Sequence, residues 1–170
     1  MRVQRAELDD RIVSGMADVL LDCVEGGASV GFMLPFEHDR AADFWNGALQ
    51  GAARGERVVL FAEDDDGRIV GTVQVILSAP ENQPHRGEIS KMLVHRQARR
   101  RGVGEALMRA AEEVALEASK TLLVLDTASD SAERLYERLG FIRAGVIPGY
   151  ALWPEGGLVD TTIYYKWLAR

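Results

Sequence analysis

The spacing of apolar residues along the first part of the chain predicts a short strand followed by two amphipathic helices. Within residues 9–25 and 37–53, apolar residues recur at helical spacing and would form one face of each helix. Residues 3–6 form the expected strand, and Gly26-Gly27 marks the end of the first helix.

Strand-like patterns dominate the middle of the chain. Residues 57–63 and 68–77 flank the acidic turn 64–67, and this arrangement predicts a hairpin. A loop rich in turn-forming residues covers 78–86, and a further strand is expected over 88–94. The middle third is therefore expected to supply three strands.

The remainder of the chain begins with a strand-helix-strand pattern. A helix predicted over 103–118 is followed by the nearly unbroken apolar run 121–126. Such a run is typical of a strand buried on both faces and paired in parallel with the strand before the helix. A helix over 131–139 comes next and ends at Gly140, which suits a left-handed cap. Two strands, 141–146 and 160–167, are then expected, joined by a loop over 147–159.

Composition is consistent with one globular domain covering residues 1–170. The chain has 20 Lys plus Arg against 26 Asp plus Glu, a net charge of −6, which argues against a nucleic-acid partner. Neither an apolar run of membrane-spanning length nor a signal-peptide core is present, so we expect a cytoplasmic protein without a membrane partner. The single cysteine, Cys23, excludes an internal disulfide and is expected to be a buried core thiol.

The segment Arg99-Arg-Arg-Gly-Val-Gly104 lies between a predicted strand and a predicted helix. Two glycines allow a ligand to approach the backbone, and the helix directs unpaired N–H groups and its positive end toward the same point. An anion such as a pyrophosphate is the expected ligand. A nucleic-acid patch and a solvated basic turn are the alternatives, whereas Rossmann and Walker loops are disfavoured because Gly104 is followed by Glu-Ala-Leu.

Two motifs, one strand-helix-strand unit apart, resemble those of the GNAT N-acetyltransferase superfamily. The pattern [RQ]-x-x-G-x-[GA] after a strand is met by Arg99, Gly102 and Gly104. The pattern Leu-Tyr-x-x-x-Gly-Phe at the end of a helix is met by Leu135, Tyr136, Gly140 and Phe141. The segments 82–86, 125–127 and 147–151 look like the tabtoxin-resistance branch of that superfamily.

The resemblance, which spans most of the chain, implies an α+β fold. It implies a central mixed, mostly antiparallel twisted sheet of six to seven strands, about four flanking helices, and a splayed parallel strand pair that binds coenzyme A. It further implies direct transfer of acetyl from acetyl-CoA to an amine, or less readily a hydroxyl, of a small-molecule acceptor, without a metal. A catalytically idle acetyl-CoA sensor is the alternative. A homodimer and a role in antibiotic or toxin resistance are compatible with the resemblance.

The same resemblance indicates the groups that would hold acetyl-CoA. The pantetheine arm would pair with the backbone of Met92, Leu93 and Val94. The diphosphate would rest on the loop and first helical turn, that is on Arg99, Arg100, Arg101, Gly102, Val103, Gly104 and Glu105. Ser129 stands where many members keep a coenzyme-binding asparagine, so its contact with the coenzyme is in doubt.

Tyr136 occupies the position where many members keep a tyrosine near the coenzyme sulfur, and it is the candidate general acid. The competing interpretation is an aromatic side chain that packs the helix onto the sheet. Two carboxylates are candidates for the general base, Glu88 and, at the end of the next strand, Asp126. Of the two, Glu88 is favoured for proton removal through water and Asp126 for binding the amine. Either carboxylate could instead cap a helix or pair with an arginine.

Acceptor specificity is expected to come from the segments 32–45, 79–86 and 149–157. Their aromatic side chains could line a pocket or belong to the core, and they are Phe32, Phe36, Trp45, Tyr150 and Trp153. His85 is a further candidate in the second of these segments.

Overall fold

The computed structural model describes residues 1–169 and contains one mixed sheet, whose strands follow the order β1-β2-β3-β4-β5-β7-β6. The strands are β1 (Arg2–Arg5), β2 (Arg57–Glu63), β3 (Ile69–Ile76), β4 (Arg86–Val94), β5 (Leu122–Thr127), β6 (Ile142–Leu152) and β7 (Leu158–Trp167). The helices are α1 (Asp10–Glu25), α2 (His38–Ala53), α3 (Val103–Glu117) and α4 (Asp130–Arg138), with a 3-10 turn η1 (Arg96–Ala98). The expected α+β fold is confirmed.

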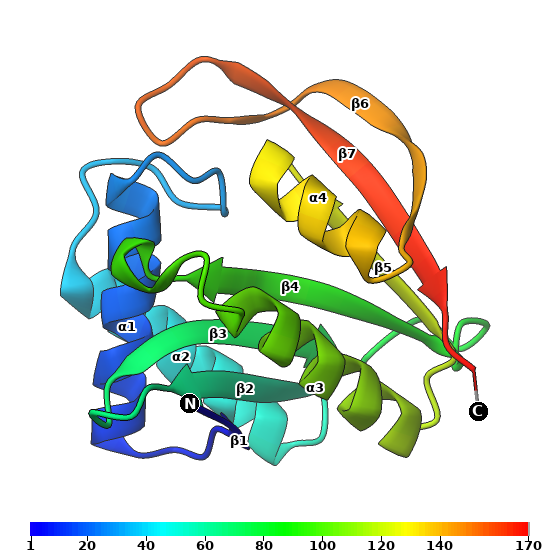
Figure 1. Ribbon diagram of the computed structural model, residues 1–170, viewed down its shortest axis with the longest axis horizontal. Coiled ribbons are helices and arrows are strands. Elements are labelled where there is room, and N and C mark those ends of the chain that lie inside the picture. The colour runs from blue at the N-terminus through cyan, green and yellow to red at the C-terminus, as the bar shows by residue number, and fades with distance from the viewer. Residues whose placement is uncertain (170) are drawn as a thin grey trace.

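Strands β4 and β5 form the parallel pair that the sequence predicts, and they separate soon after they meet. Their pairing covers only residues 86–88 of β4 and 122–124 of β5, although β4 continues to Val94 and β5 to Thr127. The other neighbouring strands in the sheet are antiparallel. In Figure 1 the two strands accordingly diverge, with β5, β7 and α4 above and β4 below.

The two faces of the sheet carry separate hydrophobic cores. Helices α1 and α2 pack on one face around Trp45 and Phe61, and α3 and α4 pack on the other around Leu107 and Tyr164. Figure 1 shows α3 running across the strands on the side opposite α2. Strands β4 and β5 stop pairing with each other between these two helical layers. The interior of the protein opens to solvent where the two strands separate.

The ends of α1 and the start of α4 lie at residues that cap or terminate a helix. Asp9 caps α1 by accepting a hydrogen bond from the Ile12 amide, and Gly26 ends that helix. The hydroxyl of Ser129 likewise accepts a hydrogen bond from the Ala132 amide and caps α4.

The expected loop over 147–159 is wrong, because β6 and β7 extend into it and leave a short connection. The ladder is irregular between Ile147 and Ala151 and then resumes with Ala151 opposite Val159. Pro148 signals a turn in the sequence, but β6 is an edge strand, where a residue without an amide donor is tolerated. Gly149, at φ +60°, donates its amide to Asp160 Oδ1 at 2.9 Å and so stabilises the irregularity.

Candidate active site

A cleft of about 1120 Å³ opens where β4 and β5 separate. One wall is β4 with the first turn of α3, and the other is the end of β5 with the start of α4. The loop after α1 and the adjoining ends of β6 and β7 also line the cleft. The cleft therefore lies at the carboxyl ends of two parallel strands, where open sheets commonly bind ligands.

The first turn of α3 presents free backbone donors to this cleft. Gly102 is the N-cap residue at φ +78°, and no side chain caps the helix. Val103, Gly104 and Glu105 follow it along the lining. A helix start whose amides lack side-chain partners is suited to an anion, as the sequence predicts.

Gly104 has a packing role as well. A Cβ atom at this position would lie 2.9 Å from the Leu135 Cδ2 atom of α4. The absence of a side chain therefore lets the start of α3 approach α4, the helix that carries Tyr136.

The three arginines that precede Gly102 have different surroundings. Arg99 and Arg100 line the cleft, and the Arg99 Nε donates to the Val94 carbonyl at 3.2 Å. Arg101 is exposed and lies outside the lining residues. Of the three arginines, Arg99 and Arg100 therefore face the cleft directly.

The pantetheine contacts expected on β4 lie at the edge that β5 leaves free. Val94 and Leu93 pair with β3 on their other side, and with Met92 they line the cleft. An extended ligand can add to such an edge as an extra strand. The Val94 carbonyl is already bonded, since it accepts from Arg99 and, at 3.5 Å, from the Cys23 thiol.

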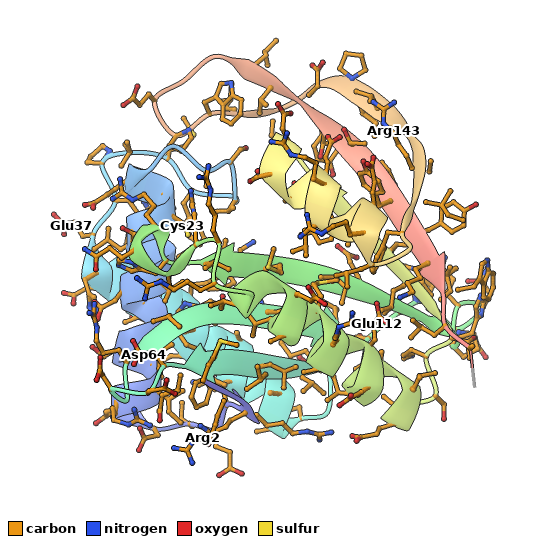
Figure 2. The ribbon with its side chains drawn as sticks, in the orientation of Figure 1. Arg2, Cys23, Glu37, Asp64, Glu112 and Arg143 are labelled. Atoms are coloured by element: carbon orange, nitrogen blue, oxygen red, sulfur yellow. The ribbon has the colours of Figure 1, made fainter. Side chains whose placement is uncertain are left out.

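Cys23 is buried, as expected, but it also lies beside the cleft. Its side chain is at the end of α1, next to the segment that follows β4 (Figure 2). Burial raises the pKa of the Cys23 thiol despite the nearby positive charge of Arg99. The cysteine is therefore held in its unreactive thiol form.

Tyr136 packs its helix against the core and also lines the cleft. It is 4% exposed, with its ring 5.8 Å from that of Phe141, and it lines the cleft. Burial, and to a lesser degree the charge of Asp126, holds the pKa of Tyr136 well above its ordinary value. The phenol accordingly keeps its proton at neutral pH, as a general acid must.

The two candidate carboxylates lie on neighbouring strands and on one face of the sheet. Glu88 is opposite Val124 in the ladder, and Asp126 comes two residues after Val124. Both line the cleft. Glu88 has Arg86 at 3.7 Å, whereas Asp126 accepts a 2.7 Å hydrogen bond from the Thr161 hydroxyl.

Ser129 lines the cleft, but its hydroxyl is used within the fold. It caps α4 and lies 3.0 Å from the Ser131 hydroxyl. The side chain at this position therefore stabilises the helix that carries Tyr136.

Three features of the cleft have no counterpart in the sequence predictions. These are the glycine-containing loop 26–31, Thr161 of β7, and Lys91 of β4. The glycines of the loop signalled only the end of a helix. Thr161 and Lys91 reach the cleft through strand pairing and a bulge, which leave no local sequence signal.

The acceptor segments are placed only in part as expected. Tyr150 and Trp153 line the cleft. Trp45 and Phe36 belong to the core, and the Trp45 indole donates to the Met16 carbonyl at 3.0 Å. His85 lies outside the lining and stacks on Trp167, with 5.9 Å between ring centroids.

A smaller hollow of about 610 Å³ lies beside α1. Its charged groups are largely paired within the protein, as Asp22 is with Arg96 at 2.9 Å. Residues 1–169 include no group of three or more His, Cys, Asp or Glu placed to hold a metal ion. Over the same residues, no helix has the length and apolar character needed to cross a membrane.

Comparison with known proteins connects this geometry to an enzyme family. The model of the acetyltransferase (GNAT) family matches residues 25–141, which include Gly102, Gly104 and Tyr136. The fold is similar to that of a ribosomal-protein-alanine N-acetyltransferase from Brucella melitensis, with a TM-score of 0.84 at 22% identity over 99% of this chain and 100% of that one.

Two other solved structures have the same fold. An N-acetyltransferase from Staphylococcus aureus Mu50 has a TM-score of 0.81 at 16% identity, over 99% of this chain and 100% of that one. A phosphinothricin acetyltransferase from Sinorhizobium meliloti, determined in complex with acetyl-CoA, has a TM-score of 0.81 at 18% identity, over 99% of this chain and 90% of that one.

Proposed function

This chain belongs to the acetyltransferase (GNAT) family, and from that premise we propose that it transfers the acetyl group of acetyl-CoA directly to an amine of a small molecule. The observation that carries the proposal is that Tyr136, Glu88 and Asp126 line the same cleft as the uncapped start of α3. An anion-binding end and a proton-transfer end thus share one cavity.

In the proposed complex, the diphosphate of acetyl-CoA rests on the free amides at residues 103–105, and Arg99 and Arg100 supply positive charge. The pantetheine arm extends along the free edge of β4 at Met92 and Leu93. Arg101, outside the lining, contributes through its charge alone. This placement directs the thioester toward Tyr136.

The transfer itself needs no covalent enzyme intermediate. Asp126 binds the acceptor ammonium, and Glu88 removes its proton through a water molecule. The neutral amine then attacks the thioester carbonyl, so that a C–N bond forms as the C–S bond breaks. Tyr136 gives its proton to the departing thiolate and regains one through water as the acetylated nitrogen loses its second proton. Burial, which raises the pKa of Tyr136, keeps the phenol protonated before the transfer.

We also propose a family branch and a homodimer. The motifs at 82–86, 125–127 and 147–151 support the tabtoxin-resistance branch and, with it, a role in resistance. The edge strand β6 carries exposed apolar side chains, including Ile142 and Ile147, which support a homodimer. A cytoplasmic location stays a prediction.

The experiment that tests the function measures free thiol release from acetyl-CoA with a panel of small amines, with mass spectrometry of the products. We expect amine-dependent thiol release and one acetyl group on the accepted amine. Acetyl-CoA binding without turnover across the panel would contradict the proposal and favour an idle sensor.

The order of substrate addition separates direct transfer from a covalent route. Direct transfer predicts intersecting initial-velocity lines, whereas an acetyl-enzyme predicts parallel ones. Cys23→Ser is the matched variant, because Cys23 is the single cysteine of the chain and lies beside the cleft. Acetylation of Cys23 during turnover would overturn direct transfer.

A further inference from the structure

Lys91 occupies an irregular position in β4, between the two candidate carboxylates and the helical layer of α1 and α2. Thr72 of β3 lies opposite Leu93, and Gln74 lies opposite Ser90, so β4 has one more residue than β3 over this stretch. This bulge holds Lys91 at φ +51°, a conformation that few non-glycine residues adopt. The Thr72 hydroxyl fixes it by donating to the Lys91 carbonyl at 2.9 Å.

The bulge turns the lysine into the cleft rather than toward bulk solvent. Its ammonium nitrogen lies 5.4 Å from the ring centroid of Phe44 in α2. A Cβ atom on Gly31 would be 3.8 Å from the same nitrogen, so the loop after α1 closes over it. Lys91 and Gly31 both line the cleft.

The lysine carries a positive charge with no fixed ionic partner. None of the salt bridges within residues 1–169 includes Lys91. Burial lowers the pKa of the ammonium, although the charges of Asp126 and Glu88 oppose this effect. A half-buried cation without a paired carboxylate is an unfavourable arrangement unless a ligand completes it.

We propose that Lys91 determines acceptor specificity by binding a carboxylate that the acceptor carries beside its amine. The inference rests on the proposed acetyl transfer and deepens it. Asp126 and Glu88 attract the ammonium end of such a molecule, while Lys91 attracts its anionic end. The chemical class that matches both ends is a zwitterionic amino acid.

Two other roles for Lys91 predict different behaviour. A purely structural lysine, held by its contact with the Phe44 ring, would affect stability without altering the choice of acceptor. If Lys91 acted as the general base, its replacement would lower the turnover of acidic and neutral acceptors equally. The ratio between two matched acceptors separates these roles from the proposed one.

The test compares α-amino acids with their carboxamides and their decarboxylated amines, using thiol release from acetyl-CoA. We expect the unaltered protein to favour the acids in kcat/KM. Lys91→Met should lower the acid-to-amide ratio by about tenfold or more, mainly through a higher KM for the acid, because a charge-assisted hydrogen bond is lost. Lys91→Arg, which retains the charge, should restore much of the preference.

Arg68→Met is the matched control. It removes one positive charge from an exposed residue outside the cleft and should leave the ratio unaltered. If the unaltered protein prefers the neutral amines, or if Lys91→Met keeps the preference for acids, the role of Lys91 is overturned while acetyl transfer stands. If no amine of any class is acetylated although acetyl-CoA binds, both proposals fail.

Discussion

The Thr161 hydroxyl donates a 2.7 Å hydrogen bond to the Asp126 carboxylate and so joins β7 to β5 at the cleft. Thr161 is 3% exposed, whereas Asp126 reaches solvent. A buried hydroxyl therefore fixes one oxygen of a carboxylate that is otherwise free to meet a ligand. Glu88 has no comparable support, since the Arg86 guanidinium is 3.7 Å away. This difference in rigidity suits Asp126 to binding and Glu88 to proton transfer.

Removal of each carboxylate should accordingly change a different kinetic parameter. Asp126→Asn should raise the KM for the amine, and Thr161→Val should do so more weakly because the carboxylate remains but loses its orientation. Glu88→Gln should lower kcat by about 100-fold and abolish the acidic limb of the pH profile, since that limb reports the base. Loss of this limb in Asp126→Asn, with its retention in Glu88→Gln, would reverse the two roles.

Replacing Tyr136 with Phe should lower kcat by about 100-fold while acetyl-CoA affinity stays nearly unaltered, because only the proton donor is removed. The raised pKa of Tyr136 also fixes the sign of a pH effect. The acid works in its protonated form, so turnover should show no alkaline fall from this group until above about pH 10, the ordinary pKa of tyrosine. Stopped-flow kinetics would measure kcat, and equilibrium binding would measure the affinity for acetyl-CoA.

Tyr164→Phe is the matched control for that variant. Tyr164 belongs to the same core cluster, but its hydroxyl donates to Glu137 at 2.9 Å and lies outside the cleft lining. Its loss should cost about 1 kcal/mol of stability and spare turnover. Equal loss of turnover in both variants would indicate that Tyr136 acts through packing.

Gly102→Ala should weaken acetyl-CoA binding. An alanine at φ +78° is strained by about 1–2 kcal/mol, and relief of that strain would move the amides at the start of α3. Gly67→Ala introduces the same strain at φ +79° in an exposed turn outside the cleft. Denaturant unfolding should show similar stability losses in both variants, and calorimetry should show weaker acetyl-CoA binding only in Gly102→Ala. Unaltered binding in Gly102→Ala would argue against the loop as the diphosphate site.

The parts of the site that the sequence predicts are those with a local cause. Gly102 is recognisable because glycines before a helix let a ligand approach the backbone, and Tyr136 because its local motif, Leu-Tyr-x-x-x-Gly-Phe, resembles that of the GNAT superfamily. Most strands and helices follow from apolar periodicity for the same reason. The exception, β6, carries Pro148 and Gly149, which signal a turn but here occupy an irregular edge strand.

The remaining features depend on how distant strands pair. Thr161 reaches Asp126 across 35 positions of sequence, through the pairing of β5 with β7. Lys91 enters the cleft because β4 gains one residue relative to β3, and nothing within its own segment indicates the bulge. Successive side chains of a regular strand lie on opposite faces of the sheet. Without the bulge, the Lys91 side chain would therefore lie on the opposite face from Glu88 and Ser90.

Lys91 should also reduce the stability of the protein, and this effect is separable from catalysis. Burial lowers the pKa of Lys91 in the folded state below its unfolded value. Between those two pKa values the unfolded chain binds more protons, so the free energy of unfolding rises with pH across this window. Below the window, the folded protein carries the full cost of the buried ammonium.

Lys91→Met removes that cost and should stabilise the protein at neutral pH, because methionine fills much of the same volume without a charge to desolvate. The gain should shrink as the pH rises toward the ordinary lysine pKa of about 10.4, where the unaltered protein also holds a neutral amine. Other titrating groups, including Cys23, are common to both proteins and cancel in the difference. Urea unfolding of the two proteins at pH 7 and at pH values up to about 10 measures this difference. A destabilised Lys91→Met variant at neutral pH would mean that the contact with Phe44 outweighs desolvation, and that the lysine is held for the fold rather than for a ligand.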